Sequence, residues 1–188
     1  MTVPVEDDPV LRQAVIAIAR ATTAHGINVN TAGNVSARCR RGQRDGMLIT
    51  PTALAYDSLL SDDLVFVDSA GASTGPRAPS SEWRFHHDIY QRRPEFNAIV
   101  HTHSPHAAAL ACQKLDIPAF HYMVAVAGGS DIRCADYATF GTQALSDHAL
   151  IALKDRSACL LEHHGVIACG AGLDQALALA IEVVRDME

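Results

Sequence analysis

The stretch Ile99-Val100-His101-Thr102-His103-Ser104 has the composition of a β-strand, yet it carries two histidines. Because the side chains of a strand alternate between its two faces, we expect His101 and His103 to project in the same direction. Two imidazoles held side by side can supply two ligands to one divalent transition metal, and zinc binds neutral ring nitrogens readily. The alternative is a pair of partly buried histidines at a strand end, each hydrogen-bonded to the backbone.

Two other segments favour the metal interpretation. Glu82 lies upstream in Pro79-Ser80-Ser81-Glu82-Trp83, and His163-His164-Gly165 lies downstream, at the end of another apolar strand. A glutamate at a helix start is often a solvated residue that complements the helix dipole. This one follows two serines, and hydroxyls together with the free N–H groups of a helix start can bind phosphate.

The geometry of a strand limits which of these groups can share one metal. Neighbouring strand residues point to opposite sides, so at most one of His163 and His164 should reach a metal held by the His-x-His pair. A carboxylate that lies beside both a phosphate site and a metal site is a candidate for proton transfer, and Glu82 is the residue in that position.

Length and composition exclude several classes of protein. The 188 residues are typical of one domain, and such a chain buries roughly 70% of its unfolded surface. The net charge of −6 and the absence of a basic run argue against binding to nucleic acid or to an anionic membrane. No apolar stretch approaches the roughly 20 residues of a membrane span, and the acidic N-terminus is unlike a signal peptide, so we expect a cytoplasmic protein.

The five cysteines are scattered and contain no Cys-x-x-Cys. In a reducing compartment they are expected to be free thiols, several of them small core residues, and none is a candidate nucleophile or metal ligand.

Turn signals and hydrophobic periodicity predict alternating helices and strands. Asp8 and Pro9 form a typical helix start, and Gly26 offers a stop. We expect helices over 9–25, 81–92 (capped by serine), 105–113 and 142–154, and from 173 onward. Strands are expected from the turn at 30–36 through 38, and over 47–50, 64–68, 98–102, 158–162 and 166–169. Loops are expected at 39–46 and 69–79, and irregular structure at 119–140.

Several of the predicted strand pairs are hairpin-like, which favours antiparallel pairing. The fold class is therefore α/β, a single domain with a central mixed, largely antiparallel sheet flanked by helices. The chain contains no Gly-x-Gly-x-x-Gly between a strand and a helix, so a dinucleotide site is not expected.

Seven motifs, spread over nearly the whole chain and in matching order, resemble the class II aldolase/adducin family. They are Thr-Ala-Gly-Asn-Val-Ser (31–36), Met-Leu-Ile-Thr-Pro-Thr (47–52), Pro-Ser-Ser-Glu-Trp-Arg-Phe-His (79–86), His-Thr-His (101–103), Ile-Pro-Ala-Phe-His-Tyr-Met (117–123), Tyr-Ala-Thr-Phe-Gly-Thr (137–142) and His-His-Gly-Val-Ile-Ala-Cys (163–169).

The resemblance implies a site built from three groups of residues. The family's ligands for one Zn²⁺ per subunit correspond to His101, His103 and His164, with Glu82 as the fourth group and a catalytic residue. The family's general acid, which reaches in from an adjacent subunit of a homotetramer, corresponds to Tyr122. The phosphate pocket corresponds to Gly33, Asn34, Thr52, Ala53, Ser80 and Ser81.

The implied activity is that of a zinc-dependent aldolase. It would reversibly cleave a ketose 1-phosphate to dihydroxyacetone phosphate and a small aldehyde, with L-fuculose 1-phosphate, which gives L-lactaldehyde, as the first choice. A Schiff-base lysine is not required, and the only lysines, Lys114 and Lys154, lie in no motif. The enzymatic alternatives are a 5-deoxypentulose or methylthioribulose phosphate aldolase, a pentulose-phosphate 4-epimerase and a methylthioribulose 1-phosphate dehydratase. The non-enzymatic alternative is an adducin-like interaction module, and the intact set of metal ligands argues against it.

Two features depart from the family pattern. Ala53 stands where the aldolases usually have glycine, so its position must suit a residue with a Cβ atom. The domain spans 1–188 and stops at Asp186-Met187-Glu188, apparently within the last helix, without the C-terminal tail that closes over the site in the family.

Overall fold

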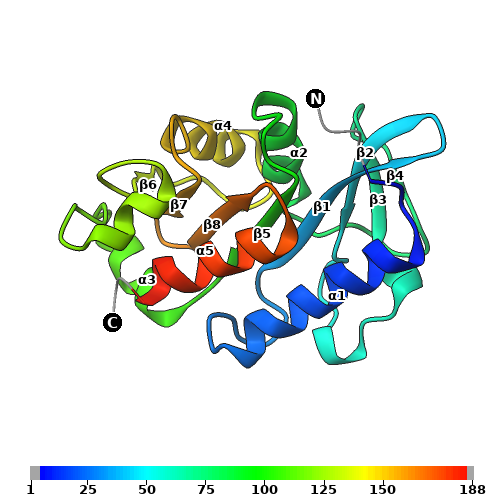
Figure 1. Ribbon diagram of the computed structural model, residues 1–188, viewed down its shortest axis with the longest axis horizontal. Coiled ribbons are helices and arrows are strands. Elements are labelled where there is room, and N and C mark those ends of the chain that lie inside the picture. Colours follow the sequence, from blue (N-terminus) through cyan, green and yellow to red (C-terminus); the bar gives the residue numbers. More distant parts are fainter. Residues whose placement is uncertain (1–4, 186–188) are drawn as a thin grey trace.

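A computed structural model describes residues 5–185, and within that range eight strands form one sheet (Figure 1). The strand order is β4-β3-β2-β1-β5-β8-β7-β6, and all neighbours are antiparallel except β6 and β7. The predicted mixed, largely antiparallel sheet is therefore confirmed. The strands are β1 (Asn34–Arg41), β2 (Arg44–Ile49), β3 (Val65–Asp68), β4 (Ser73–Thr74), β5 (Ala98–Thr102), β6 (Cys134–Ala135), β7 (Ala158–Leu161) and β8 (Gly165–Gly170).

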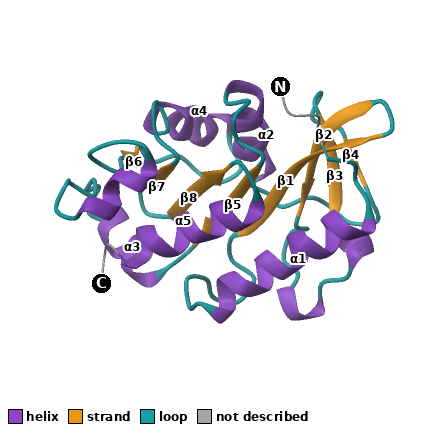
Figure 2. Cartoon of the chain, in the orientation of Figure 1, coloured by secondary structure: helices purple, strands orange, loops and turns teal. Residues whose placement is uncertain are grey.

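Five α-helices of the described chain cover the two faces of this sheet (Figure 2). They are α1 (Pro9–Ala24), α2 (Trp83–Arg92), α3 (Pro105–Ala111), α4 (Gln143–Ala152) and α5 (Leu173–Arg185). One core contains side chains of α1, α3 and α5, and the other contains side chains of α2 and α4. Because side chains alternate along β5, this strand contributes to both cores: Val100 packs in the first core and Ile99 in the second. The mixed sheet is thus buried on both sides.

The helix starts follow local chemistry. Asp8 caps α1 by accepting the Leu11 N–H at 2.8 Å, and Pro9 occupies the first helical position, as predicted. Helix α2 differs from the prediction, because it begins at Trp83 and its N-cap residue, Glu82, makes no side-chain capping bond. A serine still contributes at this helix start: the Ser80 hydroxyl accepts the Glu82 N–H at 3.3 Å, and the Ser80 carbonyl accepts the Trp83 N–H at 3.0 Å.

The predicted loop at 39–46 is wrong. Strands β1 and β2 pair from Ser36↔Ile49 to Arg41↔Arg44, so the connection is a two-residue turn at 42–43. The charged residues of this segment lie mostly on the strands, where Arg41 covers the Phe66 ring at 4.7 Å. The loop at 69–79 likewise contains the short strand β4, which pairs with β3.

The segment 119–140 is mostly irregular, as expected, but it contains the 3₁₀-helix η3 (Tyr122–Ala127) and strand β6. In the part of the chain that the structure describes, no helix is long and apolar enough to cross a membrane. The predicted end of the chain within the last helix, at 186–188, lies outside the described residues.

Candidate metal centre and substrate pocket

Four side chains from three places in the chain meet at one end of the central strands. Glu82 immediately precedes α2, His101 lies on β5, His103 follows β5, and His164 lies in the turn between β7 and β8. One ligand atom from each lies within 4.8 Å of all the others. Strand order explains the meeting, because β5 pairs with β8 on one side and with β1 on the other.

The three imidazoles converge at nearly right angles. Their ring centroids are 4.7 to 4.9 Å apart and the interplanar angles are 73° to 90°. The Nε2 atoms of His101 and His103 lie 2.9 Å apart. Three rings that direct nitrogens toward a common point match the donor arrangement of a tetrahedral metal site.

A backbone hydrogen bond fixes which nitrogen of His101 faces the centre. Its Nδ1 lies 2.8 Å from the carbonyl oxygen of Val166, and a carbonyl oxygen can only accept. The neutral ring therefore carries its hydrogen on Nδ1 and presents the Nε2 lone pair to the other ligands. Metal-binding histidines are commonly oriented by such a bond.

Burial keeps His103 in the form that binds metal. Burial, together with the neighbouring His101 and His164, lowers the pKa of His103 to about 3. The ring is therefore neutral at physiological pH and its lone pair is available.

Glu82 supplies the negative charge of the site. Burial raises the pKa of its carboxyl group, but His101 and His164 lower it by more, so that the pKa lies well below its usual range. Its Oε2 accepts the Asn34 amide at 2.9 Å and lies 3.2 Å from His101 Nε2. Its Oε1 is buried without a hydrogen-bond partner among the described residues, although His164 Nε2 lies 2.9 Å away.

This donor set fits a bound transition metal. One carboxylate and three imidazoles are typical ligands of such ions, whereas Mg²⁺ and Ca²⁺ prefer oxygen ligands throughout. A cation would also satisfy the unpartnered Glu82 oxygen.

A cavity of about 380 Å³ opens beside these candidate metal ligands. Glu82, His103 and His164 lie in its wall. The structure also brings together in this wall all six residues that the family resemblance assigns to phosphate: Gly33, Asn34, Thr52, Ala53, Ser80 and Ser81. The metal centre and the candidate phosphate pocket therefore form one continuous site.

Two loop positions in this wall adopt left-handed backbone conformations. Gly33 has φ of +70°, and a Cβ atom there would lie 2.4 Å from the carbonyl oxygen of His101, so only glycine fits. Ala53 has φ of +54°, a conformation that glycine adopts freely and that alanine adopts at a cost of about 1–2 kcal/mol. The structure therefore gives a physical reason for a glycine preference at position 53.

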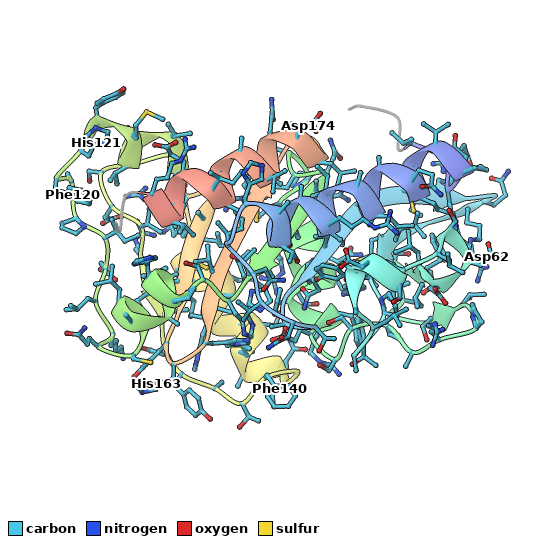
Figure 3. The ribbon with its side chains drawn as sticks, turned by 90° about the horizontal axis from the view of Figure 1, so that it is seen from below. Asp62, Phe120, His121, Phe140, His163 and Asp174 are labelled. Carbon is cyan, nitrogen blue, oxygen red and sulfur yellow. The ribbon has the colours of Figure 1, made fainter. Side chains whose placement is uncertain are left out.

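The cavity has a second wall to which the sequence prediction assigned no role. It includes Tyr137, Ala138, Phe140 and His163. Figure 3 shows Phe140 and His163 along the same edge of the molecule. Tyr137 and Phe140 lie in the motif at 137–142, but only the fold reveals that this motif faces the phosphate loops. His163 does not belong to the four-residue cluster, and its Nε2 atom lies 3.7 Å from a carboxylate oxygen of Glu162.

Tyr122 does not belong to this cavity within one chain. It begins η3, its side chain is 78% exposed, and it lines a different surface hollow together with Phe120. In Figure 3 the neighbouring residues Phe120 and His121 lie at another corner of the molecule from Phe140.

Comparisons with known proteins identify the family. Residues 13–188 match the model of the Class II Aldolase and Adducin N-terminal domain. A 5-methylthioribulose-1-phosphate/5-deoxyribulose-1-phosphate aldolase of Rhodospirillum rubrum is 56% identical over 173 residues, which is 92% of this chain and 76% of that protein. An L-fuculose phosphate aldolase of Escherichia coli K12 is 53% identical over 161 residues, which is 86% of this chain and 73% of that protein.

Solved structures agree with the sequence comparisons. The structure of an L-fuculose 1-phosphate aldolase has a TM-score of 0.91 and 36% identity, and the alignment covers 96% of this chain and 84% of that one. The fold, the family match and the relatives lead to one conclusion: the chain belongs to the class II aldolase/adducin family and is a class II aldolase, a carbon–carbon lyase.

Proposed function

We propose that the protein is a zinc-dependent aldolase that reversibly cleaves L-fuculose 1-phosphate to dihydroxyacetone phosphate and L-lactaldehyde. The observation that carries this proposal is the direct contact between the Glu82–His101–His103–His164 cluster and the cavity lined by the candidate phosphate residues. His101, His103 and His164 would hold the zinc ion, which when bound would supply Lewis-acid polarisation of the substrate ketone.

The phosphate end of the substrate is held by the loops around Gly33 and Thr52 and by the serines before α2. The Ser80 hydroxyl oxygen accepts both the Asn34 amide at 2.9 Å and the Glu82 N–H at 3.3 Å. Its own O–H therefore remains to be donated into the cavity. Binding energy from the phosphate positions the reacting carbons beside Glu82.

Glu82 transfers the proton at the carbon that separates from the aldehyde. Its carboxylate lies where the metal ligands adjoin the cavity, and its unpartnered Oε1 can accept a proton. Tyr122, donated by an adjacent subunit of a homotetramer, exchanges a proton with the aldehyde oxygen. The exposure of Tyr122 and its distance from its own chain's cavity support this role.

The Rhodospirillum rubrum relative favours a second candidate substrate. At 56% identity it is as similar to this chain as the L-fuculose phosphate aldolases are, and its name gives 5-methylthioribulose 1-phosphate and 5-deoxyribulose 1-phosphate. All of these ketose phosphates release dihydroxyacetone phosphate and differ in the aldehyde. The aldehyde is expected to lie against Tyr137 and Phe140, on the wall away from the phosphate residues.

A substrate panel tests the proposal. Zinc-loaded protein is offered L-fuculose 1-phosphate, 5-deoxyribulose 1-phosphate, 5-methylthioribulose 1-phosphate and a pentulose 5-phosphate, and release of dihydroxyacetone phosphate is measured with a coupled reductase. We expect the highest kcat/KM with L-fuculose 1-phosphate. A higher value with a 5-substituted ribulose 1-phosphate would select the second candidate. Epimerisation of the pentulose phosphate without release of dihydroxyacetone phosphate would overturn the aldolase assignment.

A further inference from the structure

A buried chain of hydrogen bonds runs from Glu82 into the core beneath α2. The Asn34 amide donates to Glu82 Oε2 at 2.9 Å, and Asn34 Oδ1 contacts His86 Nε2. His86 Nδ1 lies 2.7 Å from the Ser36 hydroxyl, which in turn lies 2.8 Å from the Tyr90 hydroxyl. His86 is fully buried on α2, and Asn34 and Ser36 lie on β1.

The donor and acceptor capacities of these groups leave one consistent direction for every bond. An ionised carboxylate only accepts, so Glu82 must face the NH₂ group of Asn34. The opposite end of that amide is an oxygen, which only accepts, so His86 must donate from Nε2. The Nδ1 of a neutral His86 is then an acceptor for the Ser36 O–H, and the Ser36 oxygen accepts from Tyr90. Burial lowers the pKa of His86 to about 3, which is consistent with a neutral ring.

We propose that His86 is a positioning residue whose Nε2–H tautomer, selected by Ser36, fixes the orientation of the Asn34 amide and through it the Glu82 carboxylate. Without the Nε2 donor, the Asn34 amide can rotate by half a turn and present its oxygen to Glu82. Two oxygen acceptors would then repel each other in a buried site, and Glu82 would leave its place beside the histidines. The effect of His86 on turnover rests on the proposed aldolase function, whereas its effect on the tautomer and on metal affinity does not.

The competing explanation is that His86 only fills space. Its ring stacks on Phe85, with the centroids 4.7 Å apart and the planes 21° from parallel. A residue with this role alone would tolerate an apolar replacement of similar size, and the position of Glu82 would not depend on its tautomer.

The tautomer can be measured without any substrate. Long-range ¹H–¹⁵N NMR of histidine-labelled full-length protein distinguishes protonated from unprotonated ring nitrogens, and the His86→Gln variant identifies the His86 signals by their loss. We expect the Nε2–H tautomer at pH 7, with and without zinc. A ring protonated on Nδ1 alone, or on both nitrogens, at pH 7 would overturn the proposal.

Three variants separate positioning from packing. His86→Leu removes both hydrogen bonds, whereas His86→Gln keeps an N–H donor for Asn34. His87→Leu is the matched control, because His87 lies on the same helix but bonds to Asp88 and to the Ser69 carbonyl, outside this chain of hydrogen bonds. Zinc affinity is measured by competition with a chelator, kcat with the best substrate, and Tm by calorimetry.

We expect His86→Leu to weaken zinc binding and to lower kcat, each about 10-fold or more, as is common when a group that orients a metal ligand is lost. His86→Gln should recover most of both losses, and His87→Leu should match the wild type. Wild-type zinc affinity in His86→Leu, or equal losses in His86→Leu and His86→Gln with equally lowered Tm, would reject the positioning role. If the wild type releases no dihydroxyacetone phosphate, the proposed function fails, while the tautomer and the zinc affinities still decide the role of His86.

Discussion

At the scale of single residues, the proposed zinc centre depends on three neutral nitrogen donors. His103 is less buried than His101 and follows the end of β5, so its replacement should disturb the sheet little. We expect His103→Ala to lose both stoichiometric zinc and activity, because two histidines and one carboxylate leave the tetrahedral set incomplete. Zinc per chain after gel filtration measures the loss.

His163→Ala is the control for this prediction. His163 is next to His164 in the sequence but lies outside the four-residue cluster, so this variant should retain a full complement of zinc. Full zinc occupancy in His103→Ala would show that the metal is not held as proposed.

The role proposed for Glu82 differs from that of the histidines, and its variant tests the difference. Glu82→Gln keeps the size of the side chain and an oxygen that can face Asn34, but it cannot take up a proton. We expect most of the zinc to remain while turnover falls by about 10²–10⁴-fold, the usual contribution of a general acid–base group. Zinc content and kcat are measured on the same preparation. Near-normal turnover with metal retained would remove Glu82 from proton transfer.

Residue identities could be anticipated from the sequence more fully than residue contacts. The family motifs led to the four residues of the candidate metal cluster and to the six residues assigned to the phosphate, which the structure brings together. Strand geometry alone could not decide which of His163 and His164 would reach a metal held by the His-x-His pair. The His86 network could not be anticipated, because it depends on how α2 packs over β1, and a buried histidine in a helix carries no local signal of its partners.

At the scale of elements, turn signals and periodicity located the five α-helices of the described chain and most of its strands, whereas the prediction was wrong at the hairpin between β1 and β2. The arginines at 40, 41 and 44 lie within the segment that was predicted as a loop, yet they extend β1 and β2. A strand that borders solvent accommodates charge on its exposed positions, and Arg40 pairs with Asp45 at 2.8 Å across this hairpin. Such cross-strand pairs depend on register, which the sequence of one strand does not reveal.

The loop that leads into β1 offers a stability test with a matched control. Gly33 and Gly26 have nearly identical left-handed φ values, +70° and +71°. An added Cβ at Gly33 would meet the His101 carbonyl oxygen at 2.4 Å, whereas a Cβ at Gly26 would have no described heavy atom within 4 Å apart from those of the glycine and its two chain neighbours. Gly26→Ala should therefore lower the free energy of unfolding by about 1–2 kcal/mol, which is the cost of holding alanine in a left-handed backbone conformation.

Gly33→Ala should lower the free energy of unfolding by clearly more, because the clash with the His101 carbonyl adds to the same backbone cost. It should also raise KM, because the clash displaces the loop beside Asn34. Urea unfolding of both variants and of the wild type gives the comparison. Equal losses in the two variants would mean that the loop relaxes away from His101 and that close packing does not require glycine there.

At the scale of the whole molecule, the exposed apolar side chains around η3 favour an assembly. Phe120, Tyr122 and Val126 are all more than half exposed, although large apolar groups of this kind are usually covered. Their location away from the chain's own cavity is compatible with a site shared between subunits. A monomeric catalyst could not use Tyr122 from where it lies.

Subunit mixing tests the shared site. Glu82→Gln and Tyr122→Phe proteins should each be inactive as homo-oligomers, because every site then lacks one of the two groups. After exchange at equal concentrations, a site is intact only when a Tyr122→Phe chain supplies Glu82 and the neighbouring chain, a Glu82→Gln chain, supplies Tyr122. In a cyclic oligomer this combination occurs at about one quarter of the sites. We therefore expect up to about a quarter of wild-type kcat to return. Each variant subjected to the same exchange alone is the control. Native mass spectrometry confirms that mixed oligomers have formed. If the mixed oligomers remain inactive, or if the active species sediments as a monomer, Tyr122 does not act across a subunit boundary.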